Sequence, residues 1–419
     1  MTASQGVDTI IIGAGPAGLA AGACLGREGV PYLILEKEAE VGSAWRRHYD
    51  RLHLHTVKGH SALPYLDYPE SYPRYVPRLD FVAYLDDYAR KMGVLPHILF
   101  GRRVERARPD AAAGGWEVRT APEGGGGDGD PTFRSRRLVI ASSYNGEANR
   151  PDWPGREGYR GTVVHTADYR NGRPFAGKDV LVVGIGNSGA EIAIDLVEHG
   201  ARPCISVRGP VWVTPRDLLG TPAQMTSILM SKLPLRIADA LVGTFLRVAV
   251  GDLSSVGLRR PDEGLFTMAW RKGRIPLIDV GTVALVKKGA IRVVPDVERF
   301  TADGVAFKDG TERRFDAVVL ATGFRARLDR FLEGAGRFVD ERGYPRWHGR
   351  EAPVADAPGL YFIGFANPPT GALREIAIEA RRIARAVAER RAASLAATPT
   401  ATPTATTAIA TAESKGAEA

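Results

Sequence analysis

Residues 8–18 read DTIIIGAGPAG and residues 179–189 read DVLVVGIGNSG. Each stretch joins an apolar run, typical of a buried strand, to a Gly-x-Gly-x-x-Gly turn and the start of a helical segment. One such turn is weak evidence by itself, but this chain repeats the whole strand, turn and helix. Backbone N–H groups and the helix dipole at such a turn bind a pyrophosphate. The sequence therefore predicts two dinucleotide-binding sites.

The residue that ends the next strand distinguishes the two sites. After the first loop the apolar run 32–35 ends at Glu36, and a carboxylate there accepts hydrogen bonds from a ribose diol. After the second loop the run 204–207 ends at Arg208, and a guanidinium there pairs with a 2′-phosphate that a carboxylate would repel. We expect FAD at the first loop and NADPH, in preference to NADH, at the second.

Two further apolar runs end in small residues, 137–143 and 316–323, and mark where the chain would leave and re-enter the first domain. The expected fold is α/β with two Rossmann-like dinucleotide-binding domains, the NADPH domain being inserted into the FAD domain. The expected cofactor-binding residues are Gly13, Gly15, Pro16, Ala17, Gly18, Glu36, Lys37, Trp45, His53, Gly184, Gly186, Asn187, Ser188, Gly189, Arg208, Thr322 and Gly323.

We predict four segments. The first part of the FAD domain occupies residues 1–150, and the NADPH domain occupies 151–323 with a helical insertion at about 217–250. The FAD domain returns at 324–391. Residues 392–419 are almost wholly Ala, Thr and Pro, which cannot bury a core, so we expect a disordered tail.

Composition narrows the location and the partners. The 56 Lys and Arg against 48 acidic residues give a net charge of +8, but no dense basic run occurs, so a nucleic-acid partner is not expected. The two cysteines, Cys24 and Cys204, lie in apolar segments, which favours a reducing compartment over disulfides or a cysteine metal site. With no signal peptide recognised, a cytoplasmic location is expected. A homodimer is an open alternative to a monomer.

The longest apolar stretch, 225–250, is interrupted by charged residues and Pro234. A lipid-exposed span would not tolerate these cheaply, so stable membrane insertion is not expected. Core packing and a lid over a substrate both remain open, with contact to one membrane surface as a further alternative.

Between the two loops, residues 159–169 read YRGTVVHTADY. This segment resembles the FxGxxxHxxx(Y/F) fingerprint of flavin-containing monooxygenases. Segments 49–55, 258–261 and 278–281 resemble the YUCCA class of plant flavin monooxygenases and its bacterial relatives. Within the fingerprint, His165 is expected to organise the domain junction.

The resemblance implies an enzyme that uses FAD, NADPH and O₂, and that forms a flavin C4a-(hydro)peroxide to oxygenate a small organic substrate. By resemblance the reaction is the oxidative decarboxylation of a 2-oxo acid such as indole-3-pyruvate. N- or S-oxygenation and Baeyer–Villiger chemistry stay open as alternatives. An NADPH-dependent electron-transfer reductase without oxygenation is the alternative from another class, although disulfide reductases need a CxxC motif that Cys24 and Cys204 cannot form.

The resemblance also suggests catalytic residues. In broader flavin-containing monooxygenases a Leu-x-Thr-Asn-x-Pro-Lys segment lies beside the flavin, and His55 and Lys58 fall on its Asn and Lys positions. His55 would then donate a hydrogen bond to the flavin adduct or order water; a structural histidine is the alternative. Asn187 is the third expected catalytic residue. His53, His55 and His60 have no carboxylate or cysteine nearby, so no metal site is expected.

Two motifs and one loop depart from the family pattern. The usual Ala-Thr-Gly is Ala141-Ser142-Ser143, and the usual Gly-Gly-x-Trp is Gly42-Ser43-Ala44-Trp45. The loop at 366–375 is longer than the plant version and is expected to border the substrate.

Overall fold

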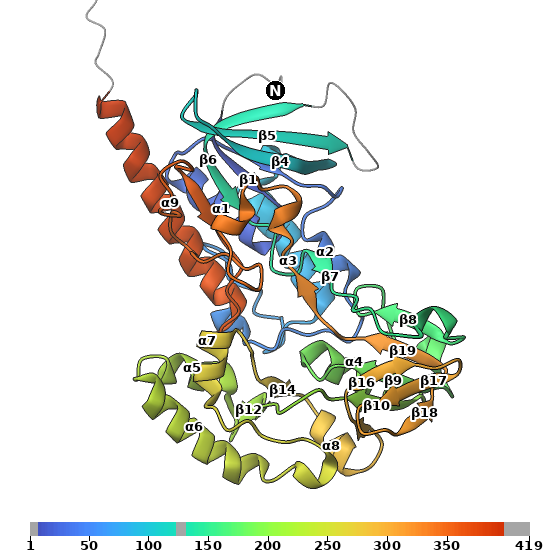
Figure 1. The fold of residues 1–419 in the computed structure, drawn as a ribbon. Helices are drawn as coiled ribbons and strands as arrows, with labels where there is room; N and C mark the ends of the chain where they lie inside the picture. Colours follow the sequence, from blue (N-terminus) through green and yellow to red (C-terminus); the bar gives the residue numbers. More distant parts are fainter. Residues whose placement is uncertain (1–6, 123–130, 398–419) are drawn as a thin grey trace, which may run out of the picture.

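The computed structural model describes residues 7–122 and 131–397. Figure 1 shows two lobes, with one sheet in the upper lobe and a second sheet beside a group of helices in the lower lobe. We call the upper lobe the first unit and the lower lobe the second unit.

The first unit is built on a seven-stranded sheet of order β3-β2-β1-β6-β5-β4, with β21 also pairing to β6. Strand β1 pairs in parallel with β2 and β6, whereas β4, β5 and β6 form an antiparallel meander. The strands are β1 (Val7–Ile12), β2 (Tyr32–Leu35), β3 (Ile98–Leu99), β4 (Arg102–Asp110), β5 (Gly115–Pro122), β6 (Thr132–Ile140) and β21 (Leu360–Phe362).

Side-chain alternation along β1 divides the core of the first unit into two layers. Ile11 packs with residues of α1, α3 and α9, while Ile10 and Ile12 face the opposite layer with the meander and the returning chain. Helices α1 and α9 contact each other extensively. The helices of this unit are α1 (Pro16–Arg27), α2 (Ser43–Arg47), α3 (Arg78–Lys91) and α9 (Ala372–Ala397).

The second unit contains a parallel five-stranded sheet of order β15-β10-β9-β19-β8, which is the pattern of a Rossmann-like core. Helix α4 packs on one face, and a three-stranded antiparallel sheet covers the other. The elements are β8 (Thr162–His165), β9 (Asp179–Val183), α4 (Asn187–Glu198), β10 (Arg202–Ser206), α8 (Thr282–Lys287), β15 (Arg292–Val294), β16 (Val297–Phe300), β17 (Gly304–Phe307), β18 (Glu312–Arg314) and β19 (Ala317–Leu320).

The second sheet is inserted between strands of the first, since β6 precedes it and β21 follows it in the chain. Where the chain passes between the units, β7 (Glu147–Ala148) pairs antiparallel with β20 (Phe324–Arg325). The expected fold class, one Rossmann-like unit inserted in another, is confirmed. The residue boundaries of the domains stay a prediction.

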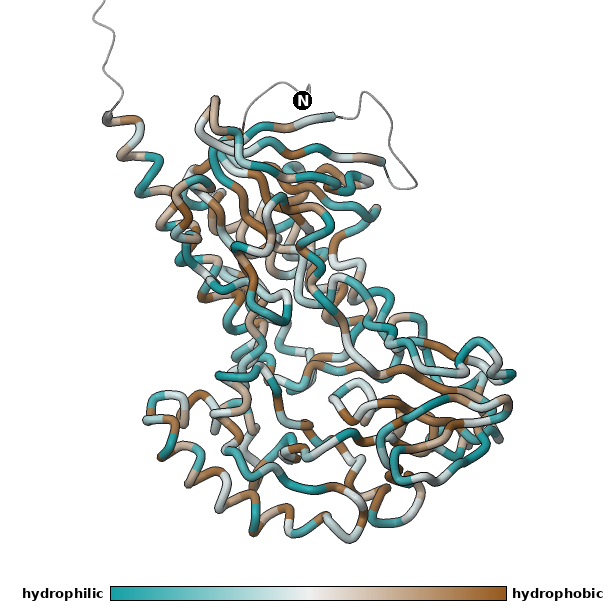
Figure 2. Tube along the Cα trace, in the orientation of Figure 1, coloured by the Kyte–Doolittle hydropathy of each residue, from teal (hydrophilic) through white to brown (hydrophobic). Residues whose placement is uncertain are grey.

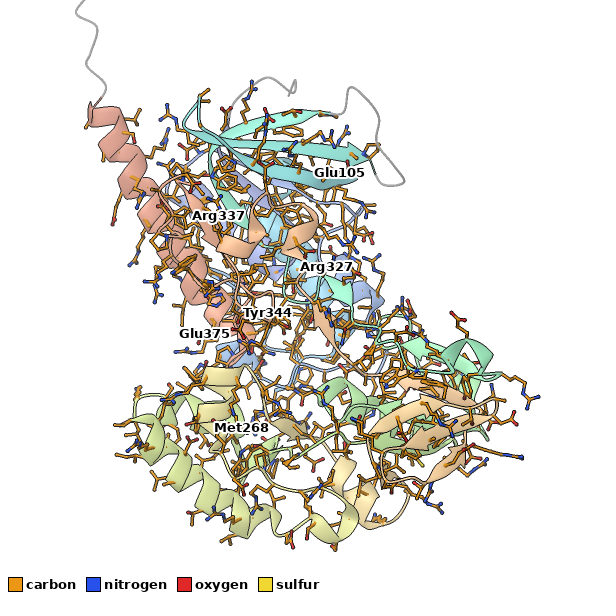
Figure 3. The ribbon with its side chains drawn as sticks, viewed as in Figure 1. Glu105, Met268, Arg327, Arg337, Tyr344 and Glu375 are labelled. Atoms are coloured by element: carbon orange, nitrogen blue, oxygen red, sulfur yellow. The ribbon has the colours of Figure 1, made fainter. Side chains whose placement is uncertain are left out.

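A group of helices extends the second unit on one side (Figures 1 and 2). Helix α7 lies beyond the expected limit of the helical insertion at about residue 250, because it packs on α6 around buried side chains such as Met268, labelled in Figure 3. The elements are β11 (Val213–Pro215), β12 (Asp217–Leu218), β13 (Thr221–Pro222), α5 (Ala223–Met230), α6 (Leu235–Val250), α7 (Leu265–Lys272) and β14 (Leu277–Asp279).

The expected start of the disordered tail at residue 392 is wrong, because α9 continues through Ala397. Residues 392–397 are four alanines with a serine and a leucine, and strong helix formers propagate an existing helix at little cost. Residues 398–419 lie outside the described residues. Within the described ranges, no helix is long and apolar enough to cross a membrane.

Candidate cofactor and active site

The first glycine of each loop lies against the end of a neighbouring strand. Gly13 has φ of +104° and Gly184 has φ of +110°, a region that favours glycine. A Cβ atom would lie 2.9 Å from the Ala141 carbonyl oxygen at the first position and 2.6 Å from that of Ala321 at the second. The two loops are therefore built alike and need glycine for the same reason.

The third glycine of each loop lets a helix pack on its own loop. A Cβ atom on Gly18 would lie 1.8 Å from the Gly13 carbonyl oxygen, and one on Gly189 would lie 2.1 Å from that of Gly184. No side chain fits at these distances, so both glycines are required by the fold itself.

The middle glycines are different, because the fold does not require them. Gly15 and Gly186 have φ of −78° and −69°, which any residue adopts. Among the described residues, a Cβ atom at either position would have no heavy atom within 4 Å, apart from the adjacent residues and the backbone of its own helix. This open space lies at the N-termini of α1 and α4, where the pyrophosphate of a dinucleotide approaches the backbone. The loops therefore fit the cofactors expected from the sequence.

Glu36 lies at the first loop, as the sequence predicts. Its carboxylate accepts the N–H of Ala14 at 2.6 Å and that of Glu38 at 3.0 Å, and the residue is 8% exposed. Burial raises the pKa of this carboxyl, and the two N–H contacts oppose the rise. Lys37 lies beside it, with its ammonium 3.7 Å from Glu38.

The position equivalent to Glu36 in the second unit is Val207, and not Arg208 as expected from the sequence. The first glycine of each loop donates its N–H to the carbonyl that ends the next strand, Leu35 in one unit and Ser206 in the other. Arg208 is therefore one residue further along. Its side chain is exposed, and among the described residues it makes no hydrogen bond or ion pair, so the guanidinium is available to a phosphate.

The strand ends beside the two loops adopt matching conformations. Ser143 has φ of +71° and Gly323, its counterpart, has φ of +78°, so this chain places a serine where the family pattern has glycine. The neighbouring Ser142 hydroxyl is buried without a hydrogen-bond partner among the described residues. An orphaned hydroxyl beside the first loop fits a polar atom of the cofactor. Thr322 instead donates its hydroxyl to the Asn149 carbonyl at 2.5 Å.

His165 ties the second sheet to the crossing between the units. Its Nδ1 accepts the Ala167 N–H at 3.1 Å, so the neutral ring carries its proton on Nε2 and donates to the Gly323 carbonyl, also at 3.1 Å. Burial lowers the pKa of this fully buried ring. The geometry supports the expected role at the domain junction.

His55 is hydrogen-bonded across the boundary between the units. Its Nε2 contacts the carboxylate of Glu191, a 2% exposed residue in the second turn of α4. Arg51 lies 3.8 Å from the same carboxylate and forms a two-point contact with Glu198 on the same helix, at 2.9 and 3.0 Å. The imidazole is thus oriented by the helix that begins at the second glycine loop.

Tyr49 extends this contact into the core of the second unit. Although it belongs to the first part of the chain, it is 2% exposed and packs in the core cluster of α4 and the second sheet. Its hydroxyl lies near the side chain of Ser188, in the first turn of α4. The N–H of Asp50 next to it donates to the Arg170 carbonyl at 2.8 Å. Segment 49–55 therefore holds the two units together.

Lys58 and Asn187, both expected in catalysis, make structural contacts. The Lys58 ammonium donates to the backbone carbonyls of Glu70 and Tyr72 at 2.8 and 2.7 Å, which fixes the loop between them. Asn187 accepts the Ile278 N–H at 2.9 Å and so joins the second loop to β14. These contacts favour positioning roles for both residues.

His53 and Trp45 both contact residues of the first part of the chain. The His53 Nδ1 is 2.7 Å from the Arg51 carbonyl oxygen, and the Trp45 ring packs edge-on against Phe81 with centroids 4.4 Å apart. Within the described residues, no group of three or more His, Cys, Asp or Glu is placed to hold a metal ion. Cys24 and Cys204 are both free and buried.

Glu191 and Gln224 were not predicted from the sequence. Gln224, at 4% exposure, accepts the Val57 N–H at 2.9 Å and donates to the Thr370 carbonyl at 2.8 Å. It therefore connects α5, the segment after His55 and the loop before α9; Figure 3 labels Glu375 near this junction. A charged residue inside the apolar stretch 190–196 was the available signal for Glu191.

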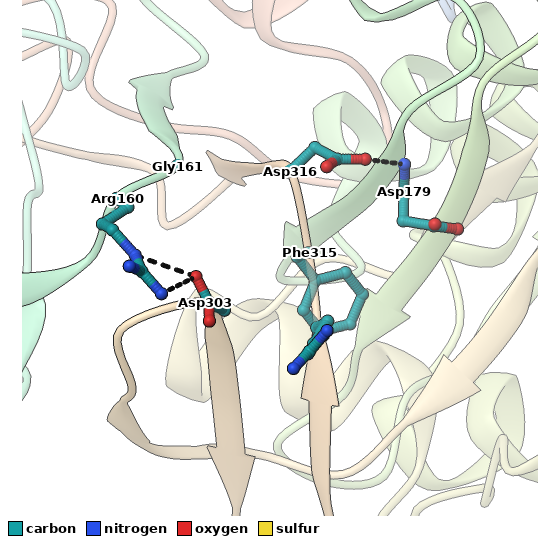
Figure 4. A pocket seen from close by; sticks show the side chains of 7 residues that line it. Arg160, Gly161, Asp179, Asp303, Phe315 and Asp316 are labelled. Carbon is teal, nitrogen blue, oxygen red and sulfur yellow. Dashed lines mark hydrogen bonds and ion pairs between the residues drawn. The ribbon is translucent and has the colours of Figure 1, made fainter.

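A cavity of about 430 Å³ in the second unit lies away from both loops (Figure 4). Its lining residues include those at the amino ends of β8, β9 and β19, whereas the second glycine loop follows the carboxyl end of β9. Arg160 and Asp303 are ion-paired beside it, and the Asp179 N–H donates to Asp316 at 2.8 Å. Ligands of open α/β sheets bind at the carboxyl ends of strands, so this cavity is not the cofactor site.

A comparison with known families decides the identity, since residues 7–391 match the family model described as flavin-binding monooxygenase-like. The chain belongs to the flavin-binding monooxygenase-like family. The monooxygenase is 42% identical over 366 residues to indole-3-pyruvate monooxygenase YUCCA1 of Oryza sativa subsp. japonica, covering 85% of this chain and 86% of the rice protein. It is 37% identical over 379 residues to indole-3-pyruvate monooxygenase YUCCA6 of Arabidopsis thaliana, covering 90% and 88%.

Solved structures share the fold of this monooxygenase. A flavin-containing monooxygenase from Stenotrophomonas maltophilia matches with a TM-score of 0.69 and 26% identity, over 92% of this chain and 99% of that one. Cyclohexanone monooxygenase from Rhodococcus sp. Phi1 bound to NADP⁺ has the same TM-score at 20% identity, over 93% and 85%. The protein is thus an FAD-dependent monooxygenase that consumes NADPH and O₂, as the sequence resemblance implies.

Proposed function

We propose that this monooxygenase converts a 2-oxo acid such as indole-3-pyruvate into the acid one carbon shorter, with release of CO₂. The observation that carries the substrate is the 42% identity, over 85% of this chain, to a protein named indole-3-pyruvate monooxygenase. FAD reduced by NADPH supplies the redox and oxygen chemistry when it is bound.

We assign the residues as follows. The first loop, from Gly13 to Gly18, binds the FAD pyrophosphate and Glu36 its ribose, while the second loop and Arg208 bind NADPH. Glu191 orients His55 toward the reacting centre. The protein's part is to hold the two cofactors in fixed register and to exclude water from the flavin.

The experiment is product analysis by mass spectrometry, with indole-3-pyruvate compared against ketones, amines and thioethers. Indole-3-acetate, formed in proportion to the NADPH and O₂ consumed, is the expected result. A lactone, N-oxide or sulfoxide instead would keep the oxygenase and replace the substrate. NADPH oxidation that yields only hydrogen peroxide with every compound would favour the reductase alternative.

We propose a cytoplasmic location, on the buried free thiols of Cys24 and Cys204. The homodimer considered from the sequence is tested by light scattering of the purified protein.

A further inference from the structure

Exposed large apolar side chains concentrate on α5 and α6 and the turn between them. Nine of the thirteen such side chains among the described residues lie between residues 219 and 270. Seven of them, from Met225 to Val248, recur every three or four positions, which places those of α6 on one side of that helix. We call the last six of these the apolar face: Leu229, Leu233, Ile237, Leu241, Phe245 and Val248.

The residues of the apolar face that belong to α6 are not on the side of this helix that packs on the protein. The buried side of the helix carries Ala238, Gly243 and Leu246, which lie toward Trp212 and α7. Helix α6 therefore has apolar side chains on both sides, although a surface helix normally presents polar ones to water. Val248 is 83% exposed, so its burial against a partner would be favourable.

Basic residues border the apolar face. Lys232, Arg236 and Arg247 are exposed, and among the described residues none of them forms an ion pair. Asp239, the acidic residue of α6, is used within the protein, since its carboxylate accepts the N–H groups of Phe266 and Thr267 at the start of α7. Residues 219–274 contain eight Lys and Arg against four Asp and Glu, a net charge of 8 − 4 = +4.

The basic residues around the apolar face favour one kind of binding partner over another. In a two-fold dimer the same surface meets itself, so the basic border of one copy would face the basic border of the other without acidic partners. A bilayer that contains anionic lipids accepts the apolar side chains among its acyl chains and pairs the border with its headgroups. We propose that α5 and α6 bind the surface of an anionic lipid bilayer, with α6 lying in the plane of the interface.

The test uses the FAD-loaded full chain and lipid vesicles in a sedimentation assay. Vesicles of phosphatidylcholine with about 30 mol % phosphatidylglycerol should bind the protein at least about tenfold more tightly than phosphatidylcholine alone. The double variant Leu241→Glu, Phe245→Glu should lose this binding. Leu395→Glu is the matched control, because Leu395 is also exposed, at 59%, but lies at the end of α9.

A second variant tests the basic residues separately from the apolar side chains. Arg236→Glu with Arg247→Glu should remove the preference for anionic vesicles. Bound FAD and thermal melting show whether each variant is folded; if the Leu241 and Phe245 variant is not, the charge variant alone decides. Equal binding to both kinds of vesicle, or none, would overturn the proposal. A dimer that dissociates only when the apolar face is changed would overturn it in favour of a second copy.

Discussion

His55 and Glu191 form a hydrogen bond that crosses from the first unit to helix α4 of the second. The helix begins at the glycine loop that we assign to NADPH, and Glu191 lies in its second turn. The imidazole is therefore positioned by the unit that binds the nicotinamide nucleotide. Since a buried carboxylate is stable only with partners, loss of His55 would leave Glu191 with Arg51 at 3.8 Å.

Replacing His55 by Ala should raise the hydrogen peroxide formed per NADPH consumed, while flavin reduction by NADPH changes little. Glu191→Ala should have the same effect if it acts through His55, and the double variant should be no worse than either single one. Stopped-flow reduction and a peroxide assay measure the two steps separately. Loss of reduction rate with unchanged coupling would assign His55 to nicotinamide positioning, and no change in either would make it structural.

Gly15→Ala should give a folded protein that does not retain FAD, because the methyl group occupies only the space of the pyrophosphate. Gly186→Ala is the matched variant in the other loop, and it should keep FAD and lose NADPH affinity. Absorbance of bound flavin and NADPH titration distinguish the two. Full FAD retention in Gly15→Ala would contradict the assignment of the first loop.

Arg208→Ala should raise the KM for NADPH about ten- to a hundredfold, equal to about 1.5–3 kcal/mol for one charge-assisted contact. The KM for NADH should stay nearly unchanged, because NADH has no 2′-phosphate. Arg202→Ala, at the other end of β10 and ion-paired to Asp179 at 2.8 Å, is the control and should change neither value. Equal losses with both nucleotides would make Arg208 structural.

Glu379 should make the protein less stable as the pH rises. Burial raises the pKa of this carboxyl from 4.5 to about 7, against the opposing hydrogen bond from the Gly364 N–H. Below about pH 4 this carboxyl is protonated in both the folded and the unfolded state, so it does not reduce the folding stability. As the pH rises, the unfolded state loses the proton first and the folding stability falls. The loss is complete above about pH 7.

The variant Glu379→Gln keeps an oxygen that can accept the Gly364 N–H and removes the charge. At pH 8 it should raise the free energy of unfolding by up to about 3 kcal/mol, and near pH 4 it should change it little. Urea unfolding at both values measures this, with Glu389→Gln on the exposed side of α9 as the control. The same gain at both pH values would show that the pKa of the Glu379 carboxyl is not raised in the folded protein.

The local parts of the site could be predicted from the sequence, and the long-range parts could not. Both glycine loops and Glu36 follow from strand, turn and helix patterns within about 25 residues. In the second unit the strand end was predicted one residue too late, so Arg208 was matched to Glu36 in place of Val207, although the spacing from glycine to strand end is the same in both units. Lys58 was expected in catalysis from the family resemblance, and its contacts with two backbone carbonyls leave no mark in the sequence.

The contact of His55 with Glu191 joins residues 136 positions apart. Neither residue indicates the other, since the pairing depends on how the two units dock. The same holds for Gln224, which connects three segments that meet only in the folded chain.

The burial of Tyr49 in the second unit limits how this enzyme can be taken apart. Transplanting residues 151–323 alone into another flavoprotein would leave a hole the size of a tyrosine ring in the transplanted core. A working chimera would have to carry residues 49–55 along with the second unit.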